Sequence, residues 1–279
     1  MNTKLKTKMT APLRNRLLAT AFCAVIASSL AQEARANNLV TDGTFLSYTG
    51  PGTAQIAAGS GFTQLTYWQT PLDPPNSYNS YNFLFLPGAE YSSPGAFDTF
   101  GNYVELYGPG NGYANGMPAT DPGGGNFVAL DSSFDTGAIS QTISGLTSGN
   151  SYTLSFYWAA AQQYGKPGST YDQLAVSLGA STQDTAQLNI AQGGFSGWNL
   201  DSMTFTATGS SELLSFLAFG GPNGTVPPFA LLGDITLTNG TRTNPPSAPD
   251  SASTATLLGL ALVAVGYAGR RGRWQRPQH

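Results

Sequence analysis

The chain has 279 residues and a formal net charge of −3, but its charges are unevenly placed. Between residues 37 and 251 only Lys166 and Arg242 are basic, against fourteen acidic side chains, a net charge near −12. Nucleic acids and anionic membrane surfaces are bound by clustered Lys and Arg, so this balance argues against both as partners of this segment and is compatible with divalent cations and neutral sugars. The sole histidine is His279, which excludes a Ser-His-Asp triad and a histidine-based zinc site from this segment.

The first 36 residues have the three-part layout of a secretory signal peptide. Five basic residues within positions 4–16 precede an apolar stretch at 17–30, and residues 34–36 read Ala-Arg-Ala, an Ala-x-Ala cleavage site. We therefore expect an exported protein whose mature chain begins at Asn37. The only cysteine, Cys23, lies in the removed segment, so the mature chain has no disulfide.

The central segment, 37–239, is predicted to be a single all-β domain. In residues 151–159 apolar side chains alternate with mixed ones, the period-two pattern of a strand with one buried face. The same alternation recurs around positions 139–143, 174–178, 203–207 and 214–218. No helix-period segment of useful length interrupts these strands, and residues 106–125 carry many Gly, Pro and Asn residues typical of a long surface loop. This organisation favours an antiparallel jelly-roll β-sandwich.

The C-terminal residues predict a membrane stop. After a linker at 240–251, residues 252–269 form an uncharged stretch. A stretch of about 18 apolar and small residues is just long enough to span the hydrocarbon core of a membrane. The tail that follows, 270–279, is basic. The positive charges of Arg270, Arg271 and Arg273 oppose its translocation across the membrane, so we expect it to stay in the cytoplasm. A buried core helix is the alternative, and the terminal arginines disfavour it.

This tail resembles the PEP-CTERM sorting signal of Gram-negative bacteria, in its Val-Pro-Asp-Ser-Gly variant. The motif is carried by Pro249, Asp250 and Ser251, while Ala248 replaces the Val and Ala252 the Gly. The resemblance implies that an exosortase-type membrane protease cuts near the motif. The protein would then be anchored in the inner membrane before processing and delivered to the cell surface or extracellular matrix afterwards.

The body resembles the galactose-binding-like jelly rolls that many carbohydrate-binding modules share. Residues 38–45 are similar to their Asn-Leu-x-x-Asn-Gly-x-Phe-Glu opening, and residues 227–237 to their terminal strand. Segments 125–131, 139–146 and 152–159 follow in the same order, so the resemblance covers most of residues 38–238.

The same resemblance implies a structural calcium where the first and last strands meet. Leu46 stands where Glu is usual and Gly233 where the first Asp is usual, which leaves Asp42 and Asp234 as metal candidates, with backbone oxygens near Thr44. Calcium takes six to eight oxygen ligands. The alternative is that Asp42 caps a turn and Asp234 faces solvent.

Sugar binding requires exposed aromatic faces, on which the C–H surfaces of a pyranose stack. Trp68, Tyr78, Tyr81 and Trp198 are the predicted platforms. Each could instead be a core residue, and the alternation of residues 151–159 places Trp158 in the core.

Three functions of different classes follow from these patterns. The leading hypothesis is a surface or matrix protein of a biofilm whose jelly roll binds a glycan, such as an exopolysaccharide. The second is a structural envelope component without a sugar site. The third is a glycoside-active enzyme using paired carboxylates, either Asp131 with Asp135 or Asp172 with Glu105. Because no motif points to those pairs, we expect no enzymatic activity.

Overall fold

The computed structural model describes residues 38–58, 60–70, 80–88, 96–98 and 100–239. The predicted signal peptide, the sorting motif, the membrane-spanning segment 252–269 and the basic tail all lie outside the described residues. Within the described part of the chain, no helix is long and apolar enough to cross a membrane.

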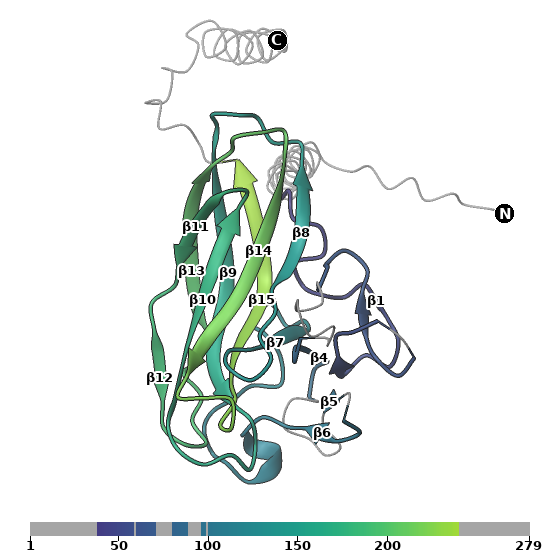
Figure 1. Cartoon of the computed structure of the whole chain (residues 1–279), viewed down its shortest axis with the longest axis vertical. Coiled ribbons are helices and arrows are strands. Elements are labelled where there is room, and N and C mark those ends of the chain that lie inside the picture. The colour runs from purple at the N-terminus through teal and green to yellow at the C-terminus, as the bar shows by residue number, and fades with distance from the viewer. Residues whose placement is uncertain (1–37, 59, 71–79, 89–95, 99, 240–279) are drawn as a thin grey trace, which may run out of the picture. The chain divides into compact units, whose positions relative to one another are not determined.

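Two β-sheets pack face to face, as the sequence predicts (Figure 1). One has the strand order β11-β10-β14-β8, with β12 also pairing with β10. The other has the order β13-β9-β15-β7-β4-β2-β5-β6, and β1 pairs separately with β3. All pairings are antiparallel except that of β2 with β5. The strands are β1 Tyr48–Thr49, β2 Ala54–Gln55, β3 Gln64–Leu65, β4 Phe83–Phe85, β5 Ala96–Phe97, β6 Tyr103–Val104, β7 Phe127–Asp131, β8 Ile139–Ser144, β9 Ser151–Gln162, β10 Thr170–Leu178, β11 Ser181–Asp184, β12 Leu188–Ile190, β13 Asn199–Thr206, β14 Ser211–Gly221 and β15 Pro228–Asn239.

The core between the sheets consists of the alternating apolar side chains that the sequence predicts. Leu174, Val176 and Leu178 of β10 face Phe156 and Trp158 of β9 in one buried cluster, which we call the inter-sheet core. Trp158 is buried there, so its predicted core position is confirmed. Burying large apolar side chains on one face of each strand supplies the main favourable free energy of a sandwich.

A second apolar cluster covers the opposite face of the larger sheet at one end. It contains Phe83 and Phe85 of β4, Phe127 of β7, and Phe229 and Leu231 of β15, and we call it the outer core. In this part of the sheet both faces are buried, which explains why β7 and the first half of β15 read as continuous apolar runs rather than as an alternation.

A β-bulge in β15 lets one strand serve both cores. The pairing with β9 shifts between Gly233 and Thr236, and Asp234 has a φ of 50°, in the left-handed region. One extra residue reverses which side chains point inward. The inter-sheet core therefore receives even-numbered residues of β15 before the bulge and Ile235 and Leu237 after it.

The predicted loop at 106–125 is confirmed as a segment without strands, although it is anchored more firmly than a surface loop. Its only regular element is a short 3-10 helix, Pro109–Asn111. Leu106 and Met117 are buried in the outer core. The loop thus forms a cover for the outer face of the larger sheet.

Candidate functional site

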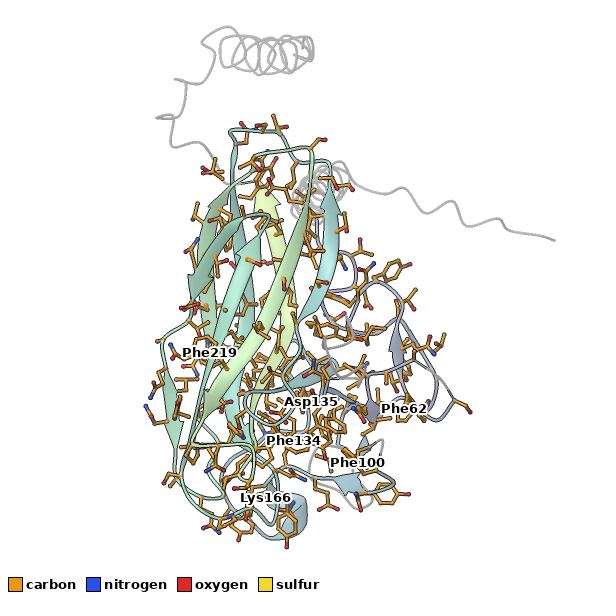
Figure 2. The ribbon with its side chains drawn as sticks, viewed as in Figure 1. Phe62, Phe100, Phe134, Asp135, Lys166 and Phe219 are labelled. Carbon is orange, nitrogen blue, oxygen red and sulfur yellow. The ribbon has the colours of Figure 1, made fainter. Side chains whose placement is uncertain are left out.

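The described residues form a hollow of about 270 Å³ at the end of the larger sheet. We call it the loop-end hollow; Figure 2 labels Phe100, Phe134 and Lys166 at this end of the sandwich. Its lining comprises Tyr81, Asp98, Phe100, Asn102, Phe134, Gln163, Lys166, Gly224 and Pro227.

These residues come together because their strands are neighbours in one sheet. Tyr81 precedes β4, Phe134 follows β7 and Pro227 precedes β15, while Gln163 follows β9. The strands β9, β15, β7 and β4 are adjacent in that order. The loops at one end of adjacent strands therefore converge, although their residues are far apart in the sequence.

A buried carboxylate shapes one wall of the hollow. Asp98 accepts hydrogen bonds on Oδ1 from the backbone N–H groups of Phe100 at 3.0 Å and Asn102 at 2.7 Å. Its Oδ2 accepts the hydroxyl of Tyr81 at 3.0 Å. Burial, followed by the charge of Asp98, raises the pKa of the Tyr81 phenol, so the hydroxyl remains a donor. The Asp98 carboxylate thus has three hydrogen-bond donors and orders the backbone at Phe100.

A second buried carboxylate orders the turn that carries Phe134. Asp131 Oδ1 accepts the backbone N–H groups of Ser133 and Phe134, both at 2.7 Å. The Phe134 ring meets Tyr81 edge-on, with ring centroids 5.4 Å apart. Burial raises the pKa of Asp131 to about 6. Hydrogen bonds to a carboxylate order this turn, and the contact with Tyr81 orders the Phe134 ring. Little conformational entropy is therefore lost when the ring binds a ligand.

The rim combines exposed rings with polar donors. Phe100 is 66% exposed and Phe134 51% exposed. The side chains of Asn102, Gln163 and Lys166 also line the hollow. Lys166 is the only basic side chain among the described residues. Two rings beside amide and ammonium donors suit a ligand that is apolar on its faces and hydroxylated at its edges.

Of the predicted platforms, Tyr81 lies in this hollow, but as part of its floor. It is only 6% exposed, because its ring packs in the outer core. The prediction of an exposed ring is therefore wrong for Tyr81, and a binding role for this residue stays a prediction. Tyr78 lies outside the described residues.

Trp68 is a core residue rather than an exposed platform. It is 4% exposed, its ring contacts Phe45 and Phe216 at centroid distances of 5.4 and 6.1 Å, and Nε1 donates to the Asp42 carbonyl at 3.0 Å. It borders a separate hollow with Ile56 and Leu65. The prediction failed because local sequence does not show that β14 supplies Phe216 as a packing partner.

Trp198 is half-buried against the outer core. Its ring meets Phe127 edge-on at 5.7 Å and Phe195 at 6.3 Å. The indole Nε1 is buried and has no hydrogen-bond partner among the described atoms. This packing corresponds to the core alternative, and Trp198 does not line the loop-end hollow.

The structure brings the opening turn against the last strand, where the metal was predicted. The Ile235 N–H donates to the Gly43 carbonyl at 3.0 Å, and a Cβ on Gly43 would lie 2.0 Å from the Ile235 carbonyl oxygen, so only glycine fits. Asp42 uses its carboxylate within the turn, accepting the N–H groups of Leu46 at 2.8 Å and Ser47 at 2.9 Å. This is the turn-capping alternative for Asp42.

Beside Asp234 the structure places a carboxylate that the sequence analysis missed, Asp121. Asp121 is buried, its Oδ2 has no hydrogen-bond partner among the described atoms, and burial and then the charge of Asp234 raise its pKa. A Cβ on Gly233 would lie 2.7 Å from that oxygen, and one on Gly123 would lie 3.3 Å from Asp234 Cγ. The glycines thus leave room around two carboxylates.

This donor set fits calcium in its chemistry. A Cβ added to Gly125 would lie 3.6 Å from Asp121 Oδ1 and 3.6 Å from the Thr44 carbonyl oxygen. The Thr44 carbonyl oxygen therefore lies near the space beside the Asp121 carboxylate. Calcium prefers oxygen ligands of this kind. Within the described ranges no cluster of three or more His, Cys, Asp or Glu side chains could hold a metal, so any calcium here needs backbone oxygens.

Of the four carboxylates considered for catalysis, two are fully buried, whereas Asp135 and Glu105 are half-buried. Asp131 and Asp172 are fully buried. The hydroxyl of Ser132 donates to Asp172 at 2.5 Å, and burial raises the pKa of Asp172 well above its ordinary value. Both carboxylates are therefore closed to solvent, and neither lines the loop-end hollow.

The residues missed by the sequence analysis share one property. Phe100, Phe134 and Lys166 lie in turns between strands, and Asp121 lies in the long loop. The one available signal was charge, since Lys166 is the only basic residue of positions 37–241.

The chain is similar in structure to several carbohydrate-binding domains. The matches include the EclA C-terminal domain, a sugar-binding protein, with 22% identity over 36% of this chain and a TM-score of 0.28. TmCBM61, solved in complex with beta-1,4-galactotriose, is 15% identical over 49% of this chain and 81% of its own length, with a TM-score of 0.29. The C-terminal CBM6 of LamC from Zobellia galactanivorans is 14% identical over 57% of this chain and 99% of its own length, with a TM-score of 0.29.

The chain spans 64% of the length of the EclA domain. The β-sandwich of this chain is established by its own strand pairing. No family model matches the sequence, and no curated protein matches it.

Proposed function

We propose that the protein binds a glycan, such as an exopolysaccharide, in the loop-end hollow of a jelly-roll body. The observation that carries the proposal is the pairing of two exposed rings, Phe100 and Phe134, with the amide and ammonium groups of Asn102, Gln163 and Lys166 around one hollow.

The geometry suits a sugar for two reasons. Aromatic rings bind the C–H faces of a pyranose, and the neighbouring polar groups hydrogen-bond its hydroxyls. In addition, Asp98 and Asp131 accept hydrogen bonds from the backbone N–H groups of Phe100 and Phe134, so the turns that carry the two rings are ordered before a ligand binds. The hollow's volume of about 270 Å³ lies just below the usual range of ligand pockets, which starts at about 300 Å³, and this favours one sugar unit at this point.

The proposal includes export and sorting. Residues 1–36 direct the chain across the inner membrane, 252–269 hold it there, and an exosortase-type protease cuts near Pro249 and Asp250. The sequence layout at the two ends supports this part of the proposal. The resulting protein would act at the cell surface or in the extracellular matrix.

We also propose a structural calcium held by the carboxylates of Asp121 and Asp234 and the carbonyl of Thr44. A bound calcium would neutralise the two carboxylates and join the long loop to β15. The unpartnered Asp121 Oδ2 supports this assignment.

Glycan-array binding tests the proposed function with the full-length protein. Replacing Phe134 with Ala, and separately Phe100 with Ala, should abolish or strongly weaken binding. Tyr67→Ala is the matched control, since Tyr67 is also an exposed aromatic residue but lies outside the hollow. Failure of the parent protein to bind any glycan would reject the proposal and favour a structural envelope component.

A further inference from the structure

Three tyrosines form an aromatic cluster beside the loop-end hollow. Tyr107, Tyr113 and Tyr164 meet edge-to-face, with centroid distances of 4.4 Å for Tyr107–Tyr113, 5.2 Å for Tyr107–Tyr164 and 6.1 Å for Tyr113–Tyr164. Tyr107 is buried, whereas Tyr113 is 36% and Tyr164 43% exposed. Neither exposed ring belongs to the inter-sheet core or the outer core.

The exposed rings are held in place from below. The Tyr107 hydroxyl donates to the Lys166 carbonyl at 2.9 Å, and the Tyr164 N–H donates to the Glu105 carbonyl at 2.7 Å. Tyr113 lies against Gly193, where an added Cβ would be 2.6 Å from the ring. A larger residue at Gly193 would displace the ring. The cluster is therefore a preorganised surface, of the kind that loses little entropy on binding.

One short turn joins the cluster to the hollow. Gln163 and Lys166 line the hollow, and Tyr164 between them belongs to the tyrosine cluster. The next residue, Gly165, has a φ of 79°, and a Cβ built there meets no atom within 4 Å. The turn thus carries two polar residues of the hollow and one ring of the tyrosine cluster, and Gly165 adds no side chain between Tyr164 and Lys166.

We propose that Tyr113 and Tyr164 form a second subsite for the glycan bound in the loop-end hollow. This inference rests on the proposed function and specifies its ligand as an oligosaccharide or polysaccharide chain, not a single sugar. One unit occupies the hollow, the chain crosses the turn at Gly165, and a later unit stacks on the tyrosines. Because the two contacts share one chain, the second adds affinity through a high effective concentration.

The test is the dependence of affinity on chain length. Calorimetry with the full-length protein would use β-linked glucan, xylan and galactan oligosaccharides, from single sugars up to hexasaccharides. The parent should bind the long members of one series about three- to tenfold more tightly than its short members. Tyr164→Ala and Tyr113→Ala should remove that gain and leave short ligands unaffected, whereas Phe134→Ala should weaken every length. Tyr164→Phe, which keeps the ring, should behave like the parent.

The outcomes separate the subsite from the hollow. Equal affinity for long and short ligands, or an equal loss at every length in Tyr164→Ala, would overturn the second subsite and leave the hollow as the site. Absence of binding to every oligosaccharide would overturn both proposals. Thermal melting of each variant shows whether a loss of affinity reflects unfolding, and Tyr67→Ala again serves as the control.

Discussion

The long strands of residues 151–239 and the short strands of residues 48–131 contribute differently to this molecule. Strands such as β9 and β15 have twelve residues each and build the inter-sheet core, whereas β2, β5 and β6 have two each. The residues of the proposed site, in contrast, lie in the turns between strands. The difference shows that the long strands supply a rigid frame, while the turns at its end supply the chemistry.

Replacing Trp68 with Ala should have the largest effect on stability, because it removes a ring that joins the N-terminal part to the frame. Trp68 packs on Phe45 and on Phe216 of β14. Loss of a large buried aromatic side chain costs about 3 to 5 kcal/mol of unfolding free energy. Urea denaturation of parent and variant measures this change.

Trp68→Phe is the matched control for that substitution. It keeps a ring but leaves the Asp42 carbonyl without its indole donor, so it should cost less, about 1 to 3 kcal/mol. An unchanged denaturation midpoint in Trp68→Ala would contradict the core position of Trp68.

The pH dependence of stability should reveal the titration of the buried carboxyl group of Asp131. Burial raises the pKa of Asp131 in the folded protein to about 6. Its value in the unfolded chain is about 3.9. Between these values the folded state binds more protons than the unfolded state, so the Asp131 contribution to the unfolding free energy falls as pH rises from about 4 to about 6. The fall is about 3 kcal/mol for a difference of about two pKa units.

Denaturation at a series of pH values checks this sign, with Asp131→Asn as the comparison. Asn keeps the oxygen that accepts the Ser133 and Phe134 N–H groups, so the turn should persist while the titration disappears. The difference in stability between parent and variant should therefore shift with pH in that window. A difference that is constant from pH 4 to pH 6 would show that Asp131 titrates normally.

Calcium should stabilise the junction between the long loop and β15. A ligand that binds only the folded state at a hundredfold excess over its Kd adds about 2.7 kcal/mol. Asp121→Asn and Asp234→Asn should each abolish this gain. Asp42→Ala should instead lower stability equally in calcium and in chelator, because its carboxylate caps the opening turn. Identical melting of the parent in calcium and in chelator would reject the metal.

The long strands of the frame could be predicted from the sequence because each strand shows its own pattern of apolar residues within a short segment. Alternation in residues 151–159 and 174–178 follows directly from burial of one strand face, and even the bulge leaves a trace, since apolar positions change parity between Leu232 and Ile235. The outer core left a weaker trace in the continuous apolar runs of β7 and β15.

The site could not be predicted in the same way. Its residues are brought together by the pairing of β9, β15, β7 and β4, which no short segment encodes. Aromatic residue type alone also does not show which rings are exposed. Trp68 is buried in the core and Tyr81 lies at the floor of the hollow, whereas the exposed rings of the hollow belong to two phenylalanines in turns. Asp121 was missed because its partner, Asp234, is 113 positions away in the sequence.

The smallest expected change in stability concerns those two exposed rings. Phe100 and Phe134 are more than half exposed, so Phe100→Ala should alter the unfolding free energy by no more than about 0.5 kcal/mol, as surface substitutions do. Phe134→Ala should cost slightly more, because its ring also contacts Tyr81. Glycan affinity should fall strongly in both. Trp68→Ala should show a large loss of stability, so measuring the two quantities on all three variants separates frame from site. If the phenylalanine variants lose several kcal/mol of stability, the rings belong to the frame, and the distinction between a rigid sandwich and a binding end fails at the hollow.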